Sequence, residues 1–269
     1  MAMEELRKKA RELLESGAVK LIIGYGQGSN KKARAVFIRK PEQTEKLIID
    51  DRCLQNLAVY LTKPEVKALG KPAIVARLPV LRTILQLANE NQIADAQIVA
   101  LGVSPDAKLV ELANLKAIED YLSGGSFELS TEEKAELLKI EKMNSAERWK
   151  FWQEQFARCI KCYACRASCP LCYCERCLQE CNQPQWIPVA SHNIGNLDWH
   201  IIRAMHLAGR CVNCGDCARA CPVGIPVNLL SQKLAEDVFK NFGVRAGMKA
   251  QLEYALGTFK PEDKEDFIR

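Results

Sequence analysis

Cysteines at regular spacing are the residues of this sequence that could do chemistry. The 269 residues include 13 cysteines, and only Cys53 lies outside the interval from Cys159 to Cys221. Two runs within that interval share the spacing C-x2-C-x2-C-x3-C-P. The first run is Cys159, Cys162, Cys165 and Cys169, and the second is Cys211, Cys214, Cys217 and Cys221. Thiolates grouped in this way favour metal binding over disulfide formation.

The spacing of each run is that of bacterial ferredoxins. Three thiolates with two residues between each pair of neighbours can surround one [4Fe–4S] cubane. The fourth thiolate projects away from that cubane. In two-cluster ferredoxins this fourth thiolate binds the other cluster. The sequence therefore predicts two [4Fe–4S] clusters with crossed ligands. The first would be held by Cys159, Cys162, Cys165 and Cys221, and the second by Cys211, Cys214, Cys217 and Cys169.

A further group of four cysteines lies between the two runs. Its members are Cys172, Cys174, Cys177 and Cys181. Four thiolates are enough for a third [4Fe–4S] cluster or for a zinc ion. The sequence leaves both metals open, together with the interpretation that these thiols bind no metal.

The remaining chemistry-bearing residues give weaker signals. All three histidines, His192, His200 and His206, lie between the runs, where a surface or core position is favoured over ligation. The glycines of GYGQG at 24–28 resemble a phosphate loop. A second predicted strand follows them instead of the helix that a dinucleotide fingerprint needs, so a hairpin is favoured. A bound FAD therefore lacks a supporting motif, and Cys53 is predicted to be a small core residue.

Composition bounds the class of protein. Apolar residues make up 48% and charged residues 26%, as in soluble globular proteins. No apolar stretch is long enough for a membrane span, and the charged first fifteen residues lack a signal peptide, so we expect a cytoplasmic protein. Two clusters of about −2 each would reduce the formal charge of +5 to about +1. Without a basic stripe interleaved with aromatics, nucleic-acid binding is not expected.

The first half of the chain alternates predicted strands with helices. This alternation predicts a small α/β domain over residues 1–125, followed by a Ser-Gly-Gly-Ser hinge. The expected strands cover 18–24, 33–39, 46–50, 73–76 and 97–102, and the expected helices cover 3–15, 54–61, 80–89 and 108–122.

The second half is predicted to be mainly helical. Residues 126–158 form a helical connector, with helix-capping pairs at Ser130/Glu133 and Asn144/Glu147. Its Trp149, Trp152 and Phe156 share one face, which we expect to pack on the cluster domain at 159–242. Residues 243–269 are predicted to be a C-terminal docking tail, with intramolecular packing as the alternative.

The cysteine segments resemble a known family. CIKCYACRASCPLCYCERC resembles the cysteine segment of the beta subunits of deazaflavin-reducing hydrogenases and formate dehydrogenases. RCVNCGDCARACPVGIPVNLL is similar to the second cluster run of those proteins and of heterodisulfide-reductase C subunits. Two segments before the cysteines also resemble the part that precedes the clusters in such subunits. They are KPAIVARLPVLRTILQLANENQI and IVALGVSP. This chain has Leu78-Pro79 and Ser104-Pro105 where relatives often carry cysteines, so a redox site at those turns lacks its ligands.

The resemblance implies an electron-transfer subunit. Such a subunit relays single electrons within a multi-subunit oxidoreductase of hydrogenase, formate dehydrogenase or heterodisulfide-reductase type, in anaerobic metabolism. Its partners would be the other subunits of that redox complex. No residue resembles a general base or a nucleophile, so no catalytic residue is predicted. The alternative is a flavin-binding oxidoreductase subunit that reduces a substrate on site.

Overall fold

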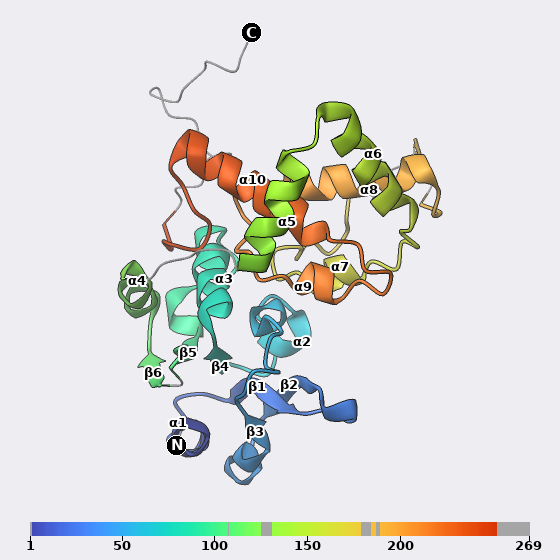
Figure 1. Cartoon of the computed structure of the whole chain (residues 1–269). Helices are drawn as coiled ribbons and strands as arrows, with labels where there is room; N and C mark the ends of the chain where they lie inside the picture. Colours follow the sequence, from blue (N-terminus) through green and yellow to red (C-terminus); the bar gives the residue numbers. More distant parts are fainter. Residues whose placement is uncertain (1, 107, 125–130, 179–183, 187–188, 252–269) are drawn as a thin grey trace. The chain divides into compact units, whose positions relative to one another are not determined.

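The structure is a computed structural model that describes residues 2–106, 108–124, 131–178, 184–186 and 189–251 (Figure 1). The chain divides into two compact units. The α/β unit contains the described residues of 1–124, 168–173 and 247–251, and the helical unit contains the other described residues. This agrees with the predicted α/β domain followed by a mainly helical one.

A mixed sheet of six described strands forms the α/β unit. The strand order is β2-β1-β4-β5-β6, and β3 also pairs with β1. Strands β1, β4 and β5 are parallel to one another, whereas β2, β3 and β6 run antiparallel to their neighbours. The strands are β1 (Leu21–Gln27), β2 (Ala33–Ile38), β3 (Leu47–Ile48), β4 (Pro72–Ala76), β5 (Val99–Val103) and β6 (Leu109–Leu112).

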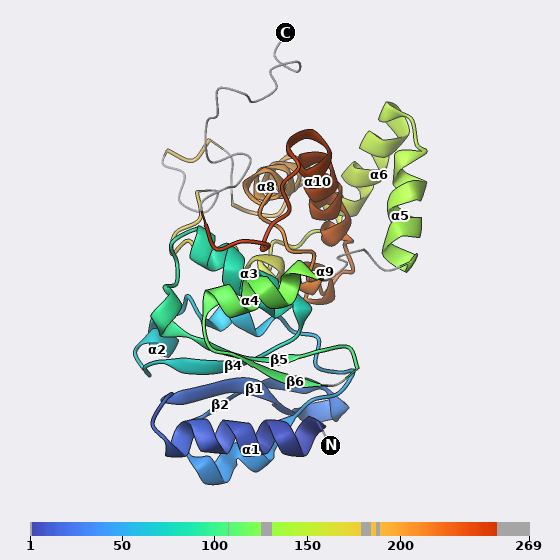
Figure 2. The same ribbon diagram turned by 90° about the vertical axis from the view of Figure 1, so that its left-hand side faces the viewer.

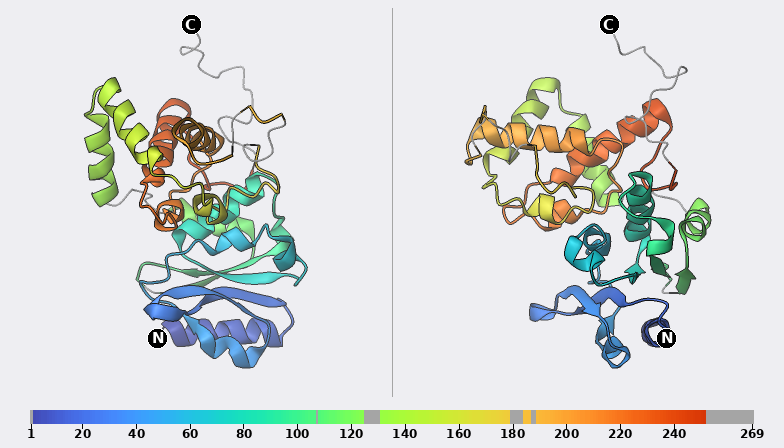
Figure 3. Two further views of the ribbon diagram at one scale, coloured as in Figure 1. Left: turned by 90° about the vertical axis from the view of Figure 1, so that its right-hand side faces the viewer. Right: turned by 180° about the vertical axis from the view of Figure 1, so that it is seen from behind.

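Helices cover both faces of the sheet. Figure 2 shows α1 (Ala2–Glu15) along one face and α3 (Leu78–Asn89) with α4 (Leu115–Ser123) along the other, and Figure 3 shows the same layers from two further sides. Because both faces are covered, the parallel strands are continuous apolar runs instead of alternating ones. The core side chains Leu21, Ile22, Ile74 and Ile84 are fully buried.

The region 108–122 differs from its predicted single helix. Residues Leu109–Leu112 form β6, which pairs with β5, and α4 begins only at Leu115. Pairing with β5 favours the strand, and two local polar contacts accompany it. The Ser104 N–H donates to the Lys108 carbonyl at 3.0 Å, which turns the chain back beside β5, and Asn114 Oδ1 accepts from the Ala117 N–H at 2.8 Å as the cap of α4.

Two further predicted elements are corrected. The predicted helix 54–61 is only a short 3-10 turn, Leu57–Tyr60, whose first turn is capped by Asn56. Lys63 is extended, as the residue before a proline tends to be, and the short α2 (Pro64–Lys67) begins after it. Strand β1 extends to Gln27, so the glycines at 24 and 26 lie within it. A Cβ at Gly26 would lie 2.5 Å from Val36 Cγ1, so these glycines permit close strand packing.

The helical unit contains four longer and two short described helices. Its helices are α5 (Thr131–Glu141), α6 (Ser145–Ala157), α7 (Ala164–Ala167), α8 (Asn193–His206), α9 (Asp216–Arg219) and α10 (Val227–Phe242). Helix α6 packs on α8, and α10 packs on α5, α8 and α9. The described helices of the predicted connector therefore belong to the same unit as Cys159, Cys162 and Cys165 and as the second cysteine run.

The start of the predicted tail packs within the α/β unit. The Gly247 N–H donates to Gln86 Oε1 at 2.9 Å, and the Ala250 N–H donates to Glu119 Oε1 at 2.7 Å. A Cβ at Gly247 would overlap the Arg82 carbonyl. Residues 247–251 are thus part of the fold, whereas 252–269 lie outside the described residues, and docking by that part stays a prediction.

The predicted cap of α6 gives a test of local stability. Asn144 Oδ1 accepts from the Glu147 N–H at 3.0 Å, and Glu147 Oε2 accepts from the Asn144 N–H at 2.9 Å, while Ser130 of the other predicted pair lies outside the described residues. Asn144→Ala should reduce stability by about 1 kcal/mol. Thermal melting followed by circular dichroism should show this, with exposed Lys150→Ala on the same helix as a near-neutral control. Equal melting temperatures for the two variants would contradict the role of the cap.

Candidate metal centre

The first cysteine run forms a tight loop directly after α6. The Cys159 N–H donates to the Phe156 carbonyl at 3.0 Å, which ends the helix at the first cysteine. Lys161 and Tyr163, on either side of Cys162, have left-handed backbones with φ of 50° and 57°. The Lys161 N–H donates to Cys159 Sγ at 3.4 Å. The backbone amide of Lys161 therefore points toward a cysteine sulfur of the same loop. Residues other than glycine rarely adopt the left-handed conformation that Lys161 and Tyr163 have here.

The second run has the same local geometry. Asn213 and Gly215 flank Cys214 with φ of 59° and 75°, and the Asn213 N–H donates to Cys211 Sγ at 3.4 Å. A short helix follows each loop, α7 after the first and α9 after the second. The repeated spacing thus produces a repeated backbone, and Asn and Gly suit it better than Lys and Tyr.

Four cysteines line one cavity inside the helical unit. Three come from the first run, and the fourth is Cys221 from the end of the second run. They are Cys159, Cys162, Cys165 and Cys221, the four residues that the sequence predicts for the first cluster. The Ile225 N–H donates to Cys221 Sγ at 3.3 Å, so this sulfur also accepts a backbone amide. Ile225 and Phe156 pack against the set from the apolar side.

The donor set is one that a [4Fe–4S] cubane takes, because four cysteine side chains line one cavity. Within the described ranges, no group of three His, Cys, Asp or Glu side chains is arranged to hold a metal ion. The type and number of metal groups stay predictions. The described cysteines are also thiols that form no disulfide.

The four cysteines predicted for the second cluster do not all lie in one unit. Cys211, Cys214 and Cys217 lie in the helical unit, whereas Cys169 lies in the segment Ser168–Tyr173, which groups with the α/β unit. Ligation of a second cluster by these four cysteines stays a prediction.

The cysteines between the runs are only partly described. Cys172 lies in the Ser168–Tyr173 segment, and Cys174 and Cys177 lie in the helical unit, but Cys181 lies outside the described residues. Arg166 Nη2 donates to the Cys174 carbonyl at 2.8 Å, which ties this segment to the first loop. A third metal site, iron–sulfur or zinc, stays a prediction.

Burial controls the electrostatics of the cavity. Burial raises the pKa of the Cys159 thiol and the pKa of the Cys165 thiol. The Arg203 guanidinium on α8 works in the opposite direction at Cys165. Arg203 is 6% exposed, and its Nη2 donates to the Cys165 carbonyl at 3.0 Å. A buried positive charge beside the thiols would offset part of the negative charge of a bound cluster.

The histidines occupy three different environments. His192 caps α8, with Nδ1 accepting from the Gly195 N–H at 3.3 Å, and His206 is exposed. His200 is buried and lines the cysteine cavity. The sequence predicts a core or surface position for each, but it carries no signal that His200 faces the cysteines, because that placement depends on the packing of α8.

Comparisons with known proteins support the predicted relationship. No family model matches the chain. The chain is 35% identical over 114 residues to the F420-dependent formate dehydrogenase subunit beta of Methanocaldococcus jannaschii. It is 36% identical over 106 residues to the F420-dependent formate dehydrogenase 1 subunit beta of Methanococcus maripaludis. The resemblance to beta subunits is confirmed. The likeness to heterodisulfide-reductase C subunits stays a prediction.

The similarity covers a limited part of each protein. The matched segments amount to 42% and 39% of this chain, and to 28% and 27% of the two relatives. The chain therefore matches less than a third of the length of these curated relatives. Their activity and partners are accordingly considered for this chain only as proposals.

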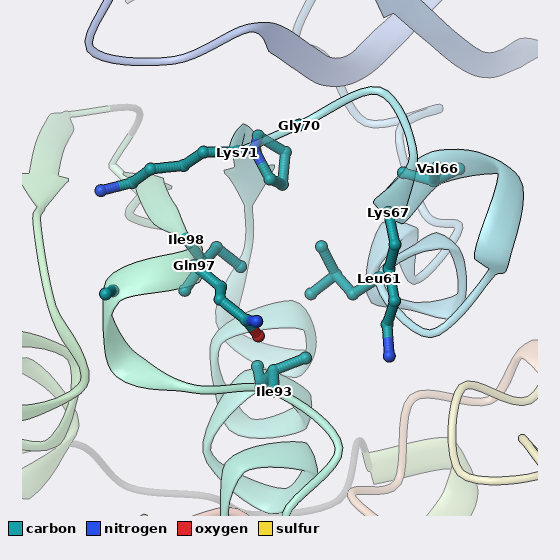
Figure 4. Close-up of a pocket in the computed structure, with 10 residues that line it drawn as sticks. Leu61, Val66, Lys67, Gly70, Lys71, Ile93, Gln97 and Ile98 are labelled. Carbon is teal, nitrogen blue, oxygen red and sulfur yellow. The ribbon is translucent and has the colours of Figure 1, made fainter.

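The α/β unit contains a hairpin and a cavity outside the cysteine region. The glycines of GYGQG at 24–28 lie in or beside the β1–β2 hairpin, as predicted. A separate cavity of about 270 Å³ is lined mainly by apolar side chains, including Leu61, Ile93 and Ile98 (Figure 4). Cys53 is fully buried, as predicted for a core residue.

Proposed function

We propose that this chain is an iron–sulfur electron-transfer subunit of a multi-subunit oxidoreductase. The observation that carries the proposal is the cavity lined by Cys159, Cys162, Cys165 and Cys221, which come from both ferredoxin-type runs. The similarity to formate dehydrogenase beta subunits supports an oxidoreductase complex of formate dehydrogenase type. Hydrogenase and heterodisulfide-reductase complexes are the related possibilities that the sequence resemblance implies.

The side chains around the cavity suit this role. When bound, a [4Fe–4S] cluster takes up and releases single electrons. The cysteine thiolates would hold it, and the Lys161 and Ile225 amides, which donate to cysteine sulfurs, would stabilise its negative charge. Cys162 is exposed and Ile160 is 58% exposed, so one side of the set lies at the surface of the described structure. That side is suited to electron exchange with a partner.

The iron content tests the proposal directly. Anaerobically prepared protein should contain at least about 8 iron atoms and 8 labile sulfides per chain, because two sets of four thiolates would each hold a cubane. A third cluster would raise both numbers towards about 12, and zinc would be detected separately by elemental analysis. The protein should also show the broad visible absorption of iron–sulfur clusters, which dithionite bleaches.

Two outcomes of this measurement would contradict the proposal. An iron content below about 6 per chain after careful reconstitution would exclude two complete cubanes. Flavin bands in the visible spectrum, together with substrate reduction by the isolated chain, would favour the alternative of a flavin-binding subunit. The Cys53→Ser variant should contain as much iron as the unaltered protein, because Cys53 is a buried core residue outside both runs.

The proposal also predicts partners. A tagged copy purified without oxygen should bring down other redox subunits, which mass spectrometry can identify. We expect the protein in the reducing cytoplasm, where thiols remain available to iron. In the described part of the chain, no helix has both the length and the apolar character to span a membrane.

A further inference from the structure

His200 is an unexplained polar group beside the four cysteines. Its side chain lies on α8 and is only 4% exposed. It lines the same cavity as Cys159, Cys162, Cys165 and Cys221. Within the described structure, its Nε2 atom is buried and has no hydrogen-bond partner. Buried polar atoms in native proteins are nearly always hydrogen-bonded, so this atom points to a partner that belongs in the cavity.

Packing holds the imidazole ring in place. The ring stacks on Phe156, with 4.3 Å between ring centroids and 9° between ring planes. Phe156 stacks in turn on Trp152, at 5.2 Å and 25°. The three rings form a stack from α6 to α8, and Phe156 itself is only 2% exposed. A ring fixed in this way presents its nitrogens in a constant direction and loses little freedom when a partner binds.

An imidazole ring can donate a hydrogen bond to a partner in this cavity. A neutral imidazole carries one N–H donor and one acceptor nitrogen. Hydrogen-bond donors around its sulfur atoms stabilise an anionic iron–sulfur cluster.

We propose that His200 Nε2–H donates a hydrogen bond to the sulfur of the cluster held by the first cysteine set and raises its reduction potential. His200 is thus a positioning and tuning residue, and the inference rests on the proposed function. A donor near sulfur stabilises the reduced cluster most, because that state carries one more negative charge. Reduction of a bound cluster by dithionite would add one electron to it, and the proton would stay on the His200 ring, so no group would be transferred.

His192 and His206 are not placed to donate a hydrogen bond to the first cluster. His192 also has a buried Nε2 without a hydrogen-bond partner in the described structure, but it does not line the cysteine cavity, and His206 is exposed on the last turn of α8. The tuning therefore acts on the first cluster and should leave the potential of the second unchanged.

Two substitutions separate a hydrogen-bonding role from a packing role. His200→Phe keeps an aromatic ring on Phe156 but removes the N–H, whereas His200→Gln gives up the ring and retains an amide donor near the position of Nε2. Each protein is titrated with dithionite under argon, and each cluster is followed by electron paramagnetic resonance. The wave missing from the Cys221→Ser protein identifies the first cluster.

We expect His200→Phe to lower the equilibrium constant for reduction of the first cluster about tenfold. This change corresponds to about 59 mV for a one-electron couple. His200→Gln should recover most of the difference. The inference is overturned if His200→Phe leaves the first potential unchanged, if both clusters shift equally, or if Gln and Phe shift it alike with iron contents equal to wild type.

A measurement on the unaltered protein covers the case in which a variant loses its cluster. Chains labelled with 15N-histidine and reduced with dithionite should show a histidine nitrogen coupled magnetically to the first cluster. The absence of that coupling would overturn the inference while leaving the proposed function intact. A protein that binds no cubane at all would instead contradict the proposed function, so the two failures are distinguishable.

Discussion

Cys221→Ser should remove the cluster held by the first run while largely sparing the cluster of its own run. Cys221 lines one cavity with Cys159, Cys162 and Cys165, although it follows Cys217 closely in sequence. Loss of one of four thiolates from a cubane leaves an iron atom without its protein ligand. The iron content should fall from about 8 to about 4 per chain, because only one cubane remains. Elemental analysis, combined with paramagnetic resonance of the reduced protein, measures this.

A reciprocal variant and a control make this prediction specific. Cys169→Ser should affect the cluster of the second run instead, and Cys53→Ser should leave both clusters unchanged. If Cys221→Ser removed the second-run cluster and spared the first, each run would bind its own cluster and the crossed assignment would be wrong.

Phe156→Ala should destabilise the helical unit and make the first cluster labile. Phe156 is 2% exposed, stacks on Trp152 and His200, and packs near Cys159 and Ile225. Truncating a buried phenylalanine costs about 3–5 kcal/mol because burial is lost and a cavity remains. We expect the melting temperature to fall by roughly 10 °C. Iron release during incubation with a chelator should also become faster.

The matched control lies on the same helix. Trp149 is 47% exposed, so Trp149→Ala should change stability by no more than about 0.5 kcal/mol. Anaerobic melting curves and chelator release, recorded for both variants, provide the comparison. A Phe156→Ala protein that melts and retains iron like Trp149→Ala would show that the aromatic stack supports neither the fold nor the cavity.

The sequence predicted the packing of the aromatic face of α6 only in part. Trp149, Trp152 and Phe156 share a helical face by spacing, but Trp152 and Phe156 belong to the apolar cluster beside the cysteines, whereas Trp149 is 47% exposed. Periodicity indicates which residues share a face, whereas the length of the neighbouring helices decides how much of that face is covered. The same limit applies to residues 108–122, where pairing with β5 produced a strand that helical periodicity did not predict.

Local spacing predicted an α/β part followed by a helical part, and it grouped four cysteines that the structure places around one cavity, although their binding of a cluster stays a prediction. The reason is that each turn around a CxxCxxC run depends on a few neighbouring backbone angles, which recur in both loops. The position of His200 was decided only by tertiary structure. Its place beside the cysteines requires α6 and α8 to pack together so that its ring lies on Phe156, and such contacts between distant segments depend on the shape of whole faces.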